Sequence, residues 1–341
     1  MLTLRPVAAE DLDALVALAE QLDSVNLPSD RAFLEARIEC SQRSFAGAIA
    51  DWRDGLYVFV LDDEQAQRCV GTSMLIAKHG RPGNPSYWLA ESREERHSHE
   101  LGRRFVHTKL QLQSTEDGPS EIGGLILDPA YRGHPEKWGK ALSIVRFAYI
   151  AMHTDRFERE IVAELLSPFE APGRSLLWDA FGARFTGLPY READRLTSRT
   201  KQFIADLFPR DPVYATLFPH AVQEVIGRPG ETAIAALRIL DKVGFHYLGQ
   251  VDPFDGGPYY GAAREAIRPV RERRQLVLPG EVYEPAAPSR GPLALLSAEG
   301  PRGFRATVVP LDDEDAPLVS KQCREALGVG AGDRVHVTPL P

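Results

Sequence analysis

The chain has 341 residues, of which 43% are hydrophobic and 26% are charged, and its net charge is −8 at neutral pH. This length favours two or more domains, and no apolar run approaches the roughly 20 residues that a membrane span needs. Because the acidic chain has no block of Lys and Arg, its charge argues against nucleic acid as a partner.

The cysteines and the N-terminal segment indicate a cytoplasmic protein. Cys40, Cys69 and Cys323 are odd in number, far apart and without CxxC spacing, which favours reduced thiols over disulfides or a zinc site. The opening segment, MLTLRPVAAEDLDALVALAE, carries acidic residues where a signal peptide has basic ones. We therefore expect neither a membrane partner nor a bound metal.

The N-terminal part of the chain predicts a strand, two helices and a hairpin. Apolar residues at helical spacing, with acidic residues in the first turn, indicate the first helix. Ser29 and Asp30 are candidate caps for the second helix, and two β-rich runs separated by a polar turn indicate the hairpin. The expected elements are a strand over Leu2–Val7, a helix over 8–22, a helix ending near Gln42, and hairpin strands over Gly55–Asp62 and Cys69–Lys78.

The middle of the chain predicts strands around one long helix. The order of these predicted strands and helices, together with the N-terminal elements, indicates an α+β fold in which a twisted mixed sheet is flanked by helices. The expected strands are Arg103–Gln113, Ile122–Leu127 and Ile161–Leu166, and the expected helices are Lys137–Met152, Arg174–Phe185, Ser198–Pro209 and Thr232–Val243.

Two later features suggest a further division of the chain. LLWDAFGARFTGL and IAALRILDKVGFHYLG share a helix–Gly–Phe–strand order, which suggests a second related αβ half, although this order is common in α/β proteins. A proline-rich connector over 279–292 then leads to three strand-like runs, which indicate a small β-rich C-terminal subdomain. The expected domains are 1–170, 171–262 and 263–341, and the three runs are Leu293–Ser297, Phe304–Pro310 and Val335–Pro339.

The segment IGGLILDPAYRGHPEKWGKALSIVRFAYIA, residues 122–151, is the most informative about chemistry. A strand ends at Asp128-Pro129, because proline stops ladder hydrogen bonding, and a basic loop containing Arg132-Gly133 leads into the long helix. Backbone N–H groups and the positive end of the helix dipole converge at such a point and form an anion site. The loop is neither a Walker loop nor a dinucleotide fingerprint. An ordinary strand–loop–helix connection with a surface arginine is the alternative.

The pattern strand–DPxYRG–loop–glycine–long helix is similar to the acyl-CoA motif of the GNAT superfamily, although the loop is longer than in the motif's strongest form. LILDPAYR, LSIVRFAYIA, FIADLFPRDPVYATLFP, AVQEVIG and VDPFDGGPYYGA resemble the arginine N-succinyltransferase family, with weaker likeness to the C-terminus. The resemblance implies a GNAT-like fold, succinyl-CoA as a co-substrate without a permanently bound cofactor, and the α-amine of L-arginine as acceptor. It also implies arginine degradation as the role and a homo- or hetero-oligomer.

The resemblance places acyl-CoA on residues 1–170 and the acceptor partly on 171–262. Leu125 matches the family's succinyl-CoA contact, where a leucine offers only backbone groups and apolar contact. The guanidinium of arginine needs carboxylates, for which Asp255 in FDGGP and Glu164 are the candidates. The alternative for Asp255 is a tight turn closed by its own backbone N–H groups. The expected acyl-CoA residues are Leu125, Ile126, Leu127, Arg132, Gly133, Gly139 and Lys140.

One residue of the family pattern is missing. The family carries a histidine, assigned as proton donor, at the position that falls on Gly230 here. A positioned acid or base contributes about 10²–10⁴-fold in rate, and His220 or Glu231 could supply it. Proximity, backbone polarisation and water could also act alone. Alternatively, this member acylates another amine such as ornithine, or it is a non-catalytic acyl-CoA-binding subunit.

Three further interpretations stay open. His97 and His99 lie in the polar run ESREERHSHE, which indicates a solvated loop rather than a metal site. The C-terminal region could be an interaction module, which would make the protein an assembly component. Succinyl specificity needs a cation for the distal carboxylate, and the equal candidates are Arg103, Arg104, Arg146 and Arg199.

Overall fold

A computed structural model describes residues 1–20, 30–171, 173–197, 200–283 and 291–341. Its helices are α1 (Leu12–Glu20), α2 (Arg31–Phe45), α3 (Trp138–Met152), α4 (Leu176–Ala180), α5 (Gly182–Thr186), α6 (Tyr190–Thr197), α7 (Gln202–Leu207), α8 (His220–Val225), α9 (Ile234–Val243), α10 (Arg268–Arg271) and α11 (Lys321–Leu327). Its strands are β1 (Leu2–Pro6), β2 (Leu56–Asp63), β3 (Arg68–Ile76), β4 (Ser86–Ser98), β5 (Arg103–Thr115), β6 (Ser120–Leu127), β7 (Glu160–Glu164), β8 (Val213–Tyr214), β9 (His246–Val251), β10 (Pro258–Ala263), β11 (Arg274–Val277), β12 (Leu293–Gly300), β13 (Gly303–Pro310) and β14 (Arg334–Pro339).

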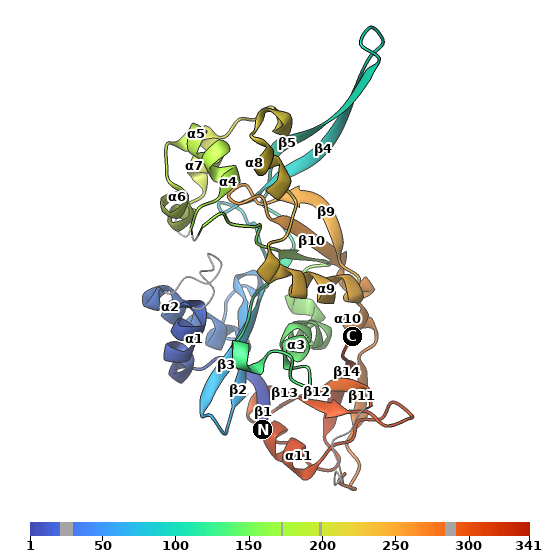
Figure 1. Ribbon diagram of the computed structural model, residues 1–341. Helices are drawn as coiled ribbons and strands as arrows, with labels where there is room; N and C mark the ends of the chain where they lie inside the picture. Colours follow the sequence, from blue (N-terminus) through green and yellow to red (C-terminus); the bar gives the residue numbers. More distant parts are fainter. Residues whose placement is uncertain (21–29, 172, 198–199, 284–290) are drawn as a thin grey trace.

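These strands form one continuous mixed sheet. Their order is β11-β14-β12-β13-β1-β2-β3-β6-β7-β10-β9-β4-β5-β8, and among the described residues only β6 and β7 pair in parallel. Figure 1 shows the resulting elongated molecule, with the C-terminal strands at one end and the β4–β5 hairpin at the other. The predicted mixed sheet flanked by helices is confirmed. In the described part of the chain, no helix combines the length and the apolar character needed to cross a bilayer.

Helices cover both faces of the middle of this sheet (Figure 1). Because side chains alternate along a strand, β2 contributes to two cores: Val58 and Val60 pack with α1 and α2, whereas Phe59 and Leu61 pack with α3. Nearly every residue of α3 from Ala141 onward is buried, as expected for a helix that is apolar around most of its surface. The long predicted helix is therefore the central core helix.

Most other predicted elements are present, with two differences. Asp30 caps α2 by accepting the Phe33 N–H at 2.9 Å, whereas the other candidate cap, Ser29, lies outside the described residues. The helix predicted over 174–185 is broken into α4 and α5. Gly182 follows the break, and a Cβ there would lie 2.3 Å from the Trp178 ring. The proposed helix–Gly–Phe–strand repeat is present only in its second copy, where Gly244 has a φ of +103° and precedes β9, because the first copy continues as α5.

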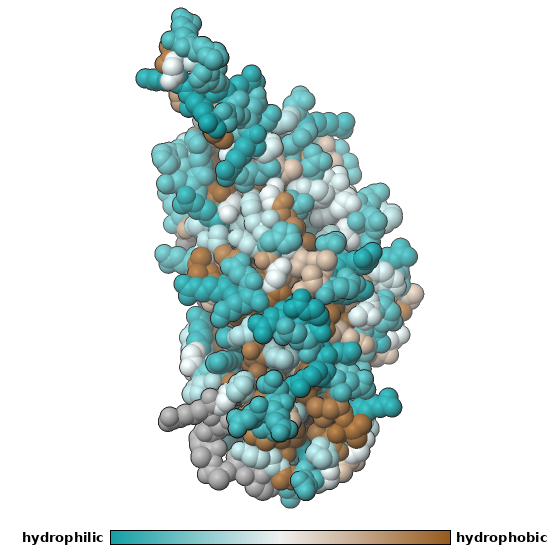
Figure 2. Space-filling view, turned by 90° about the vertical axis from the view of Figure 1, so that its right-hand side faces the viewer, coloured by the Kyte–Doolittle hydropathy of each residue, from teal (hydrophilic) through white to brown (hydrophobic). Residues whose placement is uncertain are grey.

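A long hairpin that the sequence did not predict in full extends from the body of the molecule. β4 pairs with β5 along its whole length, so the run ESREERHSHE is mostly the outer part of a strand and not a loop. Both faces of this part are exposed to solvent, and for that reason its sequence lacks the alternation that marks a half-buried strand. Figure 2 shows the hairpin as a projecting, largely hydrophilic arm. Its exposed apolar residues are Leu101, Phe105 and Val106.

The C-terminal strands are present as predicted, but they do not form a separate appendage. β13 pairs with β1 through Leu4 and Ala306, and Leu295, Phe304 and Val308 belong to the same core cluster as α3. One helix, α11, packs on this end. The region therefore extends the main sheet, and the domain boundaries inferred from the sequence stay a prediction.

Candidate active site

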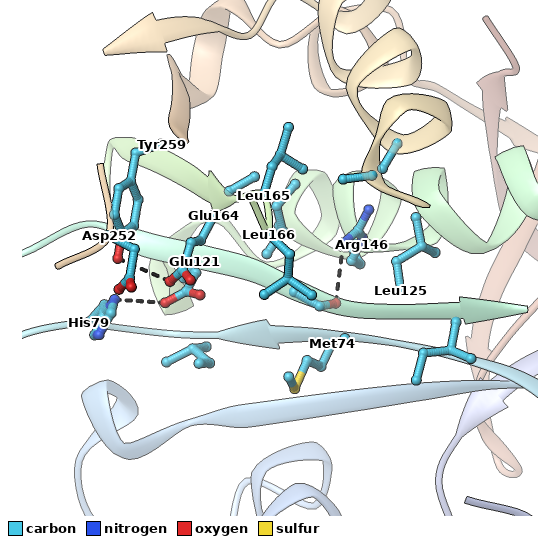
Figure 3. A pocket seen from close by; sticks show the side chains of 18 of the residues that line it. Met74, His79, Glu121, Leu125, Arg146, Glu164, Leu165, Leu166, Asp252 and Tyr259 are labelled. Carbon is cyan, nitrogen blue, oxygen red and sulfur yellow. Dashed lines mark hydrogen bonds and ion pairs between the residues drawn. The ribbon is translucent and has the colours of Figure 1, made fainter. Parts of the chain in front are cut away.

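The two parallel strands β6 and β7 separate soon after they begin. Their pairing covers only Ser120 with Ile161 and Glu121 with Val162, after which β6 pairs with β3 and β7 with β10. A cavity of about 2360 Å³ is lined by the diverging strands. In the described part of the chain no strand pairs with this side of β6 beyond Glu121, so backbone groups along this edge are available to a ligand. The wall includes 123–127 on β6 and 163–166 at and just beyond β7 (Figure 3).

A β-bulge lies in the exposed stretch of β6. The register shifts so that Gly124 and Leu125 together face Ser73 of β3. Gly124 has a φ of +55°, and a Cβ there would lie 2.9 Å from the Met74 side chain, so the bulge requires glycine. The structure thus brings the three predicted strand residues to the cavity wall, namely Leu125, Ile126 and Leu127.

The loop after β6 closes the same end of the cavity. Arg132 folds back, and its Nε donates to the Leu127 carbonyl at 3.1 Å. Gly133 follows with a φ of +72° and nothing within 4 Å of where its Cβ would lie. The four residues predicted in this region all line the cavity, namely Arg132, Gly133, Gly139 and Lys140.

The start of α3 has features that favour binding of an anion. Lys137 occupies the N-cap with a left-handed backbone, no side chain caps the helix, and its first turn contains no acidic residue. Burial and repulsion from Lys137 and Lys242 lower the pKa of Lys140. Uncapped N–H groups beside three lysines therefore present positive potential to the cavity.

Carboxylates gather on another part of the cavity wall. Oxygen atoms of Glu164, Asp252 and Asp255 lie within 4.8 Å of one another, and Tyr259 Oη donates to Glu164 Oε2 at 3.0 Å. All four residues line the cavity, and Figure 3 shows Tyr259 bonded to Glu164 near Asp252. The sequence analysis named Asp255 and Glu164 but missed Asp252, although the spacing Asp-x-x-Asp in VDPFDGGP contains it.

Asp255 holds the end of β7 against the turn before β10. Its side chain accepts the Gly257 N–H at 2.6 Å and the Ser167 N–H at 3.1 Å. A Cβ at Gly257 would lie 2.2 Å from the Leu165 carbonyl oxygen, which explains the glycine in FDGGP. The tight-turn interpretation of Asp255 is therefore confirmed. Glu164 and Asp252 are the members of the cluster that remain partly exposed to the cavity.

Burial and mutual repulsion raise the pKa values of these acids. Burial raises the pKa of Asp252 to about 6, with Lys201 opposing the shift. Burial and the charge of Asp252 raise the pKa of Asp255 to about 7 and that of neighbouring Asp194 to about 7. Burial and the charges of Asp252 and Asp255 raise the pKa of Glu164 well above its usual range. Such a cluster gains stability when a cation binds it.

A histidine–carboxylate pair lies beside the cluster. His79 Nδ1 and Glu121 Oε2 are 2.7 Å apart, and both residues line the cavity. Burial alone would raise the pKa of Glu121, but the interaction with His79 outweighs it and lowers that pKa. No sequence motif marks the pair, because His79 follows β3 whereas Glu121 lies on β6, and only the β3–β6 pairing brings them together.

The residues proposed to replace the missing histidine are not brought to the cavity. His220 begins α8 with its side chain 86% exposed and 3.8 Å from Glu224. Neither His220 nor Glu231 is among the described residues that line the cavity. Gly230, in contrast, donates its N–H to the Leu166 carbonyl at 2.7 Å. A Cβ at Gly230 would lie 2.8 Å from the Ser167 carbonyl oxygen. The neighbouring backbone therefore leaves too little room for a side chain at this position.

Family models, curated relatives and a solved structure match this chain over most or all of its length. The model for the arginine N-succinyltransferase beta subunit matches residues 2–269, and the model for the C-terminal domain of that subunit matches 281–339. Arginine N-succinyltransferases of Citrobacter koseri and Escherichia coli are each 32% identical to it, covering 100% of this chain and 98% of theirs. A structure of arginine/ornithine succinyltransferase subunit AI from Pseudomonas aeruginosa is 28% identical, with a TM-score of 0.84 over 100% of this chain and 99% of that one. The chain therefore belongs to the arginine N-succinyltransferase family.

Proposed function

We propose that the protein is an acyltransferase that moves the succinyl group of succinyl-CoA to the α-amine of L-arginine, giving N2-succinylarginine and free CoA. The observation that carries the proposal is that one cavity contains both the open edge of β6, beside the positive start of α3, and the carboxylate cluster of Glu164, Asp252 and Asp255. The first feature suits a thioester cofactor with a pyrophosphate, and the second suits a guanidinium. The family's name supports the same pair of substrates.

The donor would bind with its pyrophosphate at the start of α3. Uncapped N–H groups and lysines there match the charge of the phosphates, and the pantetheine arm would run back along the unpaired side of β6. At the bulge, backbone N–H groups near Leu125 would donate hydrogen bonds to the thioester oxygen. They would stabilise the negative charge that develops on this oxygen in the tetrahedral intermediate.

The acceptor would bind with its guanidinium at Glu164 and Asp252, both partly exposed to the cavity. This anchor would direct the α-amine along β7 towards the thioester. The amine nitrogen attacks the carbonyl carbon, the C–S bond breaks, and the CoA sulfur leaves with the electron pair and is protonated. The Glu121–His79 pair is our candidate to receive the amine proton, directly or through water, because both residues line the same cavity and their side chains lie 2.7 Å apart.

The direct test is a thiol-release assay with succinyl-CoA and a panel of amines. We expect saturable release of free thiol that depends on added L-arginine, with N2-succinylarginine formed in equal amount by mass spectrometry. Release with ornithine but not arginine would keep the acyltransferase and change its acceptor. Absence of arginine-dependent release, with no amine in the panel supporting turnover, would contradict the proposed function and favour a non-catalytic acyl-CoA-binding subunit. A cytoplasmic location and an oligomeric assembly stay predictions.

A further inference from the structure

One buried guanidinium in the cavity wall has no anionic partner among the residues that the structure describes. Arg146 of α3 is 3% exposed and lines the cavity beside β6. Its Nε donates to the Ser143 carbonyl at 3.0 Å, Nη2 to Ser143 Oγ at 2.8 Å, and Nη1 makes a long contact of 3.4 Å with the Gly123 carbonyl. A guanidinium has five N–H groups, so these contacts leave two of them for another acceptor.

No carboxylate in the described part of the chain forms an ion pair with this guanidinium. The neighbours that it does bond are neutral, and burial lowers the pKa of Arg146 to about 9, which leaves the side chain charged near neutral pH. Buried charges in proteins are normally paired, because desolvation of an isolated charge is costly. An unpaired arginine in a cavity wall therefore indicates that a ligand supplies the anion.

The position of Arg146 relative to β6 indicates which anion this is. A pantetheine arm that runs back from the start of α3 would pass Leu127, then Leu125 at the bulge, and the acyl chain would continue towards Gly123. Figure 3 shows the Arg146 side chain pointing from α3 to β6, with the contact to Gly123 marked. Leu125 and Gly123 are two residues apart, which is at most about 6.6 Å along a strand, and a succinyl chain with its two methylene groups can span this distance towards the guanidinium.

We propose, on the basis of the proposed function, that Arg146 binds the distal carboxylate of the succinyl group and thereby selects succinyl-CoA over acyl-CoA esters with uncharged chains. The two unused N–H groups would donate to the carboxylate, which suits the planar fork of arginine better than lysine.

The other described arginines that could serve this role are exposed or contact other groups. Arg103 and Arg104 are exposed on the β4–β5 arm, where Arg104 pairs with Glu95 at 2.5 Å. Arg199 lies outside the described residues. Arg37 of α2 also lines the cavity, but it lies over the Phe33 ring at 4.7 Å. Among the arginines of this comparison that the structure describes, only Arg146 is both buried and bonded to β6.

The test compares acyl preference in the full-length protein and three variants: Arg146→Met, Arg146→Lys and, as a control, Arg37→Met. For each, kcat/KM is measured with succinyl-CoA and acetyl-CoA at saturating arginine, and binding of both esters is measured calorimetrically without arginine. We expect Arg146→Met to lower the succinyl-to-acetyl ratio about 10- to 100-fold, the range for losing hydrogen bonds to a charged group. Arg146→Lys should give an intermediate ratio, and Arg37→Met should leave the ratio of the parent unchanged.

Other results would overturn this assignment. If the parent itself shows no preference for succinyl-CoA, or if Arg146→Met lowers both reactions and both affinities equally, the arginine has a structural role. If Arg37→Met changes the ratio instead, the carboxylate is bound from the opposite helix layer. Should Arg146→Met fail to fold, the Arg146→Lys ratio decides, and a value equal to that of the parent counts against the assignment. If the parent protein shows no acyl transfer with either ester, that result would instead contradict the proposed function.

Discussion

Side chains of opposite charge line separate parts of the cavity. The carboxylates of Glu164 and Asp252 are partly exposed to the cavity, whereas Lys137 and Lys140 lie at the start of α3 and also line the cavity. This separation of charge within one cavity would orient two substrates relative to each other before any bond is made.

The raised pKa values of the aspartates predict how arginine binding depends on pH. The pKa of Asp252 is raised to about 6 and that of Asp255 to about 7, so lowering the pH from about 8 to about 5.5 protonates these acids in the free protein. A protonated carboxyl does not attract the guanidinium, which stays charged throughout this range. The KM for arginine should therefore rise as the pH falls, as measured by thiol release at saturating succinyl-CoA.

Asp252→Asn provides the matched variant for this prediction. The amide keeps an oxygen that can accept the N–H groups of Phe254 and Asp255 but loses the charge, so the KM for arginine should increase about 10-fold or more. Asp13→Asn removes an exposed charge outside the cavity and should leave KM unchanged. A KM for arginine that is flat with pH and equal in both variants would contradict a guanidinium site, and loss of activity on dialysis against EDTA would indicate a metal there instead.

The sequence predicted some residues of the candidate site and missed others. Asp255 and Glu164 could be named because arginine requires carboxylates and FDGGP is a distinctive turn, and both lie in the cluster. His79 and Glu121 could not be named, since their contact depends on strand pairing and not on spacing. His220 was chosen for proximity in sequence to Gly230, yet it lies exposed on α8.

Among the elements, the separation of β6 from β7 is what creates the site. The bulge at Gly124 turns the exposed stretch of β6 towards the cavity, and only a residue without a Cβ fits both its φ of +55° and the contact with Met74. The sequence predicted the strand, the loop and the long helix, because proline, glycine and an apolar run mark their boundaries. It did not predict the bulge, which depends on the partner strand β3.

Gly124→Ala tests the role of the bulge. A left-handed alanine costs about 1–2 kcal/mol, and its Cβ would meet Met74, so relief of the strain should shift the bulge and weaken acyl-CoA binding roughly 10-fold in calorimetry. Gly102→Ala is the control, because Gly102 has a similar φ of +59° with nothing within 4 Å of its Cβ position, at the tip of the β4–β5 hairpin. Both variants should lose stability, but only Gly124→Ala should lose affinity. Equal affinities in the two variants would show that the bulge does not hold the ligand.

For the whole molecule, one sheet joins parts that the sequence suggested were separate. β13 pairs with β1 at the N-terminal side, and β9 pairs with both β10 and β4 at the other. Local patterns predicted the C-terminal strands correctly, but a proline-rich connector cannot reveal that these strands share a core with α3. The outer part of β4 was missed because neither of its faces is buried.

This continuity places the two proposed substrate regions on the two sides of a single opening in the sheet. β6 lies on the part that carries α1, α2 and the C-terminal strands, and β7 lies on the part that carries β9, β10 and the arm. The cavity between them therefore depends on both parts of the sheet.

Calorimetric titration of the full-length protein with succinyl-CoA, followed by arginine in the presence of CoA, tests most directly whether this opening is a substrate site. We predict saturable binding of succinyl-CoA with a rise in melting temperature, and binding of arginine to the CoA-loaded protein. The absence of heat and of any rise in melting temperature with CoA esters at millimolar concentration would contradict it.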